Sequence, residues 1–154
     1  MPSSDSRQYH EKMSYLEGLI NDLYQDEKYL LPVFLLRCQL IELSLKYLLA
    51  NYPYRSKEFV SLEKIEELTL GQTVSELKKI KDVYMDEIVE KADKLKEMRN
   101  DLTHNFIKSD ITINEMNIGI EENMKFADQI EGDIYRYFSY VNEVLFGKEN
   151  RFIG

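Results

Sequence analysis

Two side chains that can carry chemistry lie five residues apart in the stretch 99–104, which has the sequence RNDLTH. His104 is able to take and give a proton near neutral pH, because imidazole titrates in that range. Arg99 stays charged and holds a phosphate through two parallel hydrogen bonds. Together they are able to cleave RNA without a metal. His104 would move a proton at the ribose 2′-hydroxyl or at the leaving oxygen, and Arg99 would stabilise the charge that builds on the phosphate.

The helical spacing of this segment divides its side chains between two stripes. Asn100 and His104 are four residues apart, so Asn100 is able to hydrogen-bond the imidazole and orient it. Arg99 and Thr103 share the neighbouring stripe. Arg99 and His104, however, are about 140° apart around a straight helix, so one helix does not bring them together. Either the long arginine side chain swings across, or a symmetric dimer places two copies of the pair in one groove.

The same residues also fit an ordinary solvent-exposed helix surface with no catalytic role. His104 shares its face with Glu97 and Asn100, as a solvated helix surface would. Arg99 would then simply form an ion pair, either with Glu97 or with Glu42 of another helix. The residue types alone therefore leave a catalytic pair and an ordinary surface ion pair both open.

Other catalytic signatures are absent from the sequence. It contains no GxxxxGK[ST] loop, no GxGxxG turn, no CxxC and no HExxH. Two histidines and one cysteine are too few soft ligands for a typical zinc site, so we expect no metal and no cofactor. The cysteine, Cys38, lies in the most apolar segment, where burial raises the pKa of a thiol and makes it inert.

The elements that must position these residues are helices, because the 154 residues include only six glycines and three prolines. Apolar residues at spacings of three and four predict long helices over residues 6–24, 29–51, 84–106 and 114–145, with Gly147 ending the last. Residues 56–80 are less regular, and Thr73 with Glu76 is expected to cap a short helix there. We therefore predict an all-α fold. It is an antiparallel bundle of four long helices plus short ones, in a single domain over 1–154 with frayed ends at 1–6 and 148–154.

The apolar stretch 29–49 is predicted to be a buried central helix. Arg37, Glu42 and Lys46 interrupt it, and such charges are costly inside a lipid bilayer, so no membrane association is expected. A lone cysteine and the lack of a signal peptide lead us to expect a cytoplasmic protein. The net charge of −8 argues against a general nucleic-acid coat protein and fits a basic protein partner or a local cationic cleft. Four cations of the third long helix supply local positive charge among acidic neighbours: Lys91, Lys94, Lys96 and Arg99.

Three short segments, in this order, resemble the HEPN-domain family. Residues 41–49 (IELSLKYLL) resemble its second-helix pattern, an acidic and a basic residue in an otherwise apolar helix. Residues 68–72 (LTLGQ) resemble a Thr-Leu-Gly turn of several members. Residues 99–104 resemble the R-x(4–6)-H motif, including the polar residue directly after the arginine. The likeness spans roughly residues 30–145.

The resemblance implies a homodimer in which the Arg and His of both subunits line a cleft at the interface. Active members are metal-independent endoribonucleases of toxin–antitoxin, phage-defence and RNA-processing systems. His104 would then be the acid/base, Arg99 the phosphate binder and Asn100 the polar accessory, with RNA as substrate and an antitoxin or other protein as partner. The alternative that the resemblance leaves open is a non-catalytic module for protein interaction or nucleotide binding.

Supporting roles fall to residues of the second long helix. Glu42 and Lys46 are four residues apart and are expected to form a semi-buried pair in an apolar helix. Glu42 would either hold Arg99 in place for the reaction or form a plain interhelical salt bridge.

Overall fold

The computed structural model describes residues 4–52, 59–81, 83–105 and 110–140. Every regular element in these ranges is a helix, which confirms the predicted all-helical class. Phe106, Gly147 and the residues around them lie outside the described ranges, and so does the predicted end of the last helix.

Four long helices carry the fold. They are α1 (Ser4–Leu23), α2 (Leu30–Ala50), α4 (Val83–Asn105) and α5 (Ile113–Tyr140). The shorter ones are η1 (Glu27–Tyr29), η2 (Leu62–Glu67) and α3 (Leu70–Leu77). The predicted bounds of the first three long helices agree with these to within two residues. The helix α1 nevertheless begins inside the segment that was expected to fray.

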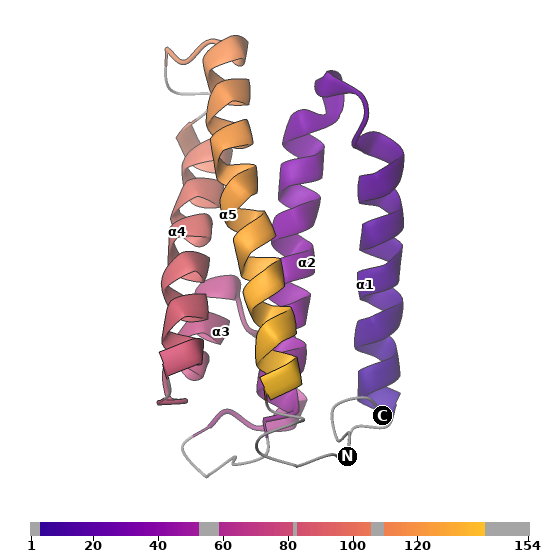
Figure 1. The fold of residues 1–154 in the computed structure, drawn as a ribbon, viewed down its shortest axis with the longest axis vertical. Helices are drawn as coiled ribbons and strands as arrows, with labels where there is room; N and C mark the ends of the chain where they lie inside the picture. Colours follow the sequence, from indigo (N-terminus) through magenta and orange to yellow (C-terminus); the bar gives the residue numbers. More distant parts are fainter. Residues whose placement is uncertain (1–3, 53–58, 82, 106–109, 141–154) are drawn as a thin grey trace.

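The helix α2 lies in the middle of the arrangement. It packs against α1 on one side and against α5, α3 and α4 on the other, and α4 in turn packs against α5 (Figure 1). Consecutive long helices run in opposite directions, whereas α2 and α5 run in the same direction and are in direct contact (Figure 1). Because α1 packs mainly against α2, grooves remain beside α1 on both sides of α2. That the helices form an antiparallel bundle of the HEPN type remains a prediction.

The core gathers around α2, which confirms the prediction of a buried central helix. Phe34, Ile41, Leu45, Leu48 and Leu49 of this helix are completely buried. The predicted apolar stripes of the neighbouring helices meet them. Their buried members are Ile88, Ala92 and Leu95 of α4, and Ile120, Ala127, Ile130, Ile134 and Tyr137 of α5. No helix in the described part of the chain is both long and apolar enough to cross a membrane.

The cap of α3 differs from the sequence-based expectation. The capping residue is Thr69, whose Oγ1 accepts a hydrogen bond from the Gln72 amide at 3.1 Å. The Gln72 side chain in turn accepts from the Thr69 amide at 2.9 Å, completing a capping box. The prediction for Thr73 was wrong, because α3 begins four residues earlier so that Leu70 can enter the core. Thr73 is buried inside the helix and donates its hydroxyl to the Thr69 carbonyl at 2.9 Å.

We expect Thr69→Ala to lower the free energy of unfolding by about 1 kcal/mol, because it removes the side-chain acceptor of the capping box. Urea denaturation followed by circular dichroism measures this change. Ser75→Ala, at an exposed position in the same helix, is the matched control and should change stability by less than about 0.5 kcal/mol. Equal stabilities of the two variants would contradict the assignment of Thr69 as the cap.

Candidate functional site

Arg99 lies in the C-terminal half of α4 and faces α2. Its Nη1 is 3.6 Å from Oε1 of Glu42, and both side chains are about three-quarters buried, with 26% and 24% of their surface exposed. Of the two ion pairs that the sequence left open for Arg99, the one with Glu42 is therefore confirmed. A carboxylate on a different helix fixes the position of this guanidinium.

Glu42 binds a second cation. Its Oε2 is 3.1 Å from Nζ of Lys46, one turn further along α2, and only 7% of the Lys46 side chain is exposed. The predicted semi-buried pair is thus confirmed. Lys46 also donates a hydrogen bond to the Glu66 carbonyl at 3.1 Å, which ties η2 to α2. One carboxylate therefore lies between two cations. Through Arg99 it links α2 to α4, and the Lys46 that it binds links α2 to η2.

Cys38 lies one turn before Glu42 and is completely buried. Burial raises the pKa of its thiol to about 12, and the nearby charges of Arg99 and Arg37 only partly oppose this rise. Since the thiolate is the reactive form, this thiol is unreactive near neutral pH, as predicted.

His104 and Asn100 are exposed on the last turns of α4, whereas Arg99 is half-buried against α2. This is the angular separation that the helical spacing predicts. The two side chains with acid–base and phosphate-binding chemistry are therefore close in sequence but do not converge within one chain. The side chain of Thr103, the fourth predicted site residue of this segment, lies outside the described part of the structure.

The other cations of α4 are engaged by acids. Nζ of Lys91 donates to Oδ2 of Asp133 on α5 at 2.5 Å. Burial would raise the pKa of Asp133, but its bonds from Lys91 and Arg136 outweigh this and lower the pKa. Lys94 and Lys96 pair with acidic residues of α4 itself, Glu90 at 3.7 Å and Asp93 at 3.5 Å. The local positive charge expected along α4 is thus largely compensated.

One face of α2, between α1 and α4, is open to solvent and was not singled out from the sequence. Pro32 and Gln39 are exposed there, and Leu35, Leu36 and Leu43 are half-buried. We call these five residues the open face of α2. The seven-residue spacing of Leu36 and Leu43, and of Pro32 and Gln39, is the signal that could have found it.

A cavity of about 500 Å³ lies between the open face of α2 and α1. Its lining includes Gln39, Glu42 and Leu43 of α2 and Tyr15 of α1. The carboxylate that holds Arg99 therefore borders an open groove. Among the described residues, no three His, Cys, Asp or Glu side chains are arranged to hold a metal ion.

Comparisons with known proteins identify no relative. No protein-family model, no curated protein and no solved structure matches this chain.

We expect Glu42→Gln to lower the free energy of unfolding by about 2 kcal/mol, because it leaves the buried ammonium of Lys46 without a carboxylate. Urea denaturation measures this loss. Glu90→Gln removes an exposed carboxylate that pairs with Lys94, and as the control it should cost less than about 1 kcal/mol.

The double variant Glu42→Gln/Lys46→Met should regain part of the lost stability, since it removes the ammonium of Lys46, the more deeply buried of the two cations that Glu42 binds. If Glu42→Gln is as stable as the control, the carboxylate does not hold the two cations in solution.

Proposed function

We propose that this protein is a metal-independent endoribonuclease of the HEPN type, which acts as a homodimer through Arg99 and His104. The observation that carries the proposal is the ion pair between Arg99 and Glu42, in which a carboxylate of α2 holds the guanidinium of α4, five residues before an exposed histidine. The ordered resemblance of three segments to the HEPN family supports the same function.

The pairing with Glu42 suits Arg99 for binding a phosphate. A guanidinium carries five N–H donors in a planar fork, and this geometry matches the oxygens of a phosphate. A cation that is already oriented needs little rearrangement when charge develops on a phosphate. Glu42 is thus a positioning residue, and Arg99 is the group that touches the substrate.

His104 supplies the proton transfers in this scheme. Acting as a base, it removes the proton of the ribose 2′-hydroxyl, and the 2′-oxygen attacks the adjacent phosphorus. The bond from phosphorus to the 5′-oxygen breaks, and that oxygen receives a proton from a histidine acting as an acid. The products are a 2′,3′-cyclic phosphate and a 5′-hydroxyl end, and Asn100 orients the imidazole.

Two copies of the chain bring these groups together. Because Arg99 and His104 diverge around α4, a complete site needs an arginine and a histidine from facing copies. The open face of α2 supports such a pairing, since it presents three half-buried leucines, of which Leu43 borders the groove beside Glu42. In the proposed dimer these faces meet, and the two copies of α4 line one cleft.

The distribution of positive charge limits the proposed site to contact with a few phosphates of the RNA. In this scheme the two copies of Arg99 are the main phosphate binders, whereas Lys91, Lys94 and Lys96 lie further toward the N-terminus of α4 and are each paired with an acid. Neutralising two phosphates of a single strand gives a logarithmic salt dependence of only about −1.4.

We expect the purified protein to cleave single-stranded RNA in EDTA, and His104→Ala to reduce cleavage at least about 100-fold, because proton transfer is lost. Gel analysis of a labelled oligonucleotide measures the rate. His10→Ala removes the other histidine, on α1, and should retain the wild-type rate. A substrate with a 2′-deoxyribose at the cleavage site should resist cleavage.

Equal cleavage by His104→Ala and wild-type protein would refute the catalytic assignment. If wild-type protein cleaves no RNA but binds a mononucleotide, and Arg99→Ala abolishes that binding, the site is a nucleotide-binding module instead.

A further inference from the structure

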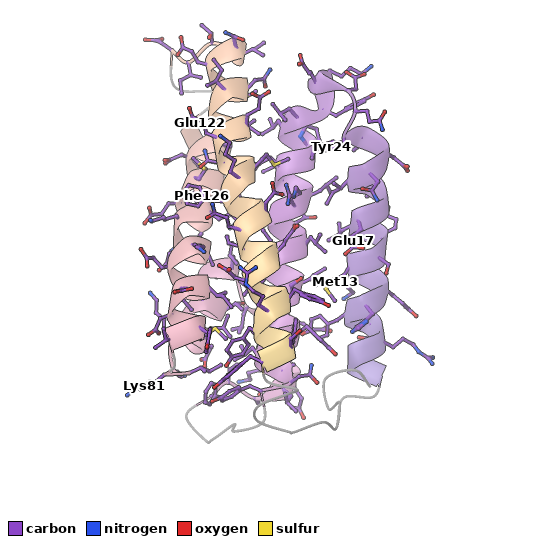
Figure 2. The ribbon with its side chains drawn as sticks, viewed as in Figure 1. Met13, Glu17, Tyr24, Lys81, Glu122 and Phe126 are labelled. Carbon is purple, nitrogen blue, oxygen red and sulfur yellow. The ribbon has the colours of Figure 1, made fainter. Side chains whose placement is uncertain are left out.

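A second groove runs on the other side of α2, between α1 and α5. Its volume is about 630 Å³, and its lining comes from three helices, including Glu17 of α1, Arg37 of α2 and Tyr135 of α5. Met13 and Glu17 project from α1 toward α2 in this region (Figure 2). A neighbouring cavity of about 440 Å³ shares Tyr24, Arg37 and Asp128 with it, so the two adjoin. We call them together the α1–α5 groove.

The α1–α5 groove is strongly acidic. Six carboxylates line it: Glu17, Asp26, Glu27, Glu121, Asp128 and Glu131. Among the described residues that line it, Arg37 is the one cation, and only 11% of its side chain is exposed. Its Nη2 already donates to Asp128 at 2.5 Å and to Glu131 at 2.9 Å. The lining therefore keeps an excess of negative charge that no side chain of the groove neutralises.

One carboxylate oxygen in the groove lacks a donor. Oε1 of Glu131 is buried, and no described residue donates a hydrogen bond to it. Its Oε2 is the atom that binds Arg37. Burying a carboxylate oxygen without a partner is unfavourable, so a donor that enters the groove would gain a hydrogen bond there.

Aromatic rings stand beside these acids. Tyr24 and Tyr135 line the groove with 68% and 74% of their surfaces exposed, and Phe138 contributes a third ring. The ring faces of exposed tyrosines are poorly solvated by water, and they stack well against the planar guanidinium of an arginine. Carboxylates and aromatic faces together match arginine better than the compact, strongly hydrated ammonium of lysine.

We propose that the α1–α5 groove docks an arginine-bearing segment of a basic partner protein. The groove follows α5 from Glu121 to Phe138, about 26 Å along a helix, which is the length of a peptide segment rather than of one small cation. The charge of the groove is complementary to such a segment, and the acidic chain as a whole favours a basic partner.

This docking surface is separate from the proposed nuclease site. Arg37, in the floor of the groove, and Gln39, on the open face, are about 160° apart around α2. A partner in the groove would therefore leave Arg99 and the open face uncovered. The two proposals stand or fall independently.

The probe is a synthetic helical peptide of about 17 residues with three arginines on one face, added to ¹⁵N-labelled full-length protein. We expect amide chemical shifts to change at Glu17, Tyr24, Asp128 and Tyr135. A peptide of the same charge with lysines in place of arginines should bind at least about five-fold more weakly, because it loses the stacking on tyrosine. Shift changes spread over the exposed acids of α4 would overturn the proposal, since they would show only general charge attraction.

Single variants at the rim test the residues directly, by fluorescence anisotropy of the labelled arginine peptide. Glu17→Gln and Tyr135→Ala change exposed side chains and should each weaken binding about five-fold while keeping the helical circular dichroism of the wild type. Glu87→Gln, which removes one exposed charge on α4, is the charge-matched control and should bind as the wild type does. The proposal would also be overturned if Glu17→Gln and Tyr135→Ala bound the arginine peptide as tightly as Glu87→Gln.

Discussion

The carboxylate of Glu42, held between Lys46 and Arg99, is the interaction on which the rest of the structure depends. It lies in the most apolar helix of the chain, where an unpaired charge would be strongly destabilising. Each of its two cations links α2 to another element. Lys46 donates a hydrogen bond to the main chain of η2, and Arg99 belongs to α4. Pairing these charges therefore fixes two elements, η2 and α4, against α2, and it places the arginine of the candidate site.

Arg37 imposes a second constraint on the same helix. Burial would lower the pKa of its guanidinium, but its bonds to Glu131 and Asp128 outweigh this and raise the pKa. That pairing fixes α5 against α2. Because α1 packs mainly on α2 alone, a groove is left on each side of it, one beside Glu42 and one above Arg37. The proposed nuclease and docking surfaces therefore lie beside two charged side chains of α2, Glu42 and Arg37, which are paired with residues of neighbouring helices.

The long helices and their core stripes were predictable, because apolar spacing reports burial directly. The Glu42–Lys46 pair followed from a spacing of four, and the sequence left Glu42 as one of two partners for Arg99. The cap at Thr69 was missed, since the choice between Thr69 and Thr73 depends on Leu70 entering the core. The partners of Arg37 are more than 90 residues away on α5, and the grooves depend on how α1 packs. No local pattern encodes such contacts, so the sequence could not reveal them.

The most direct test of the shared site is to mix two variants that are each expected to be inactive, Arg99→Ala and His104→Ala. With free exchange of subunits, roughly half of the dimers are mixed, and each has one intact Arg99 facing one intact His104. The account predicts that RNA cleavage in EDTA returns in the mixture and is absent from either variant alone. A mixture that stays inactive, although differently tagged subunits co-purify, would contradict a site built from two copies of the chain.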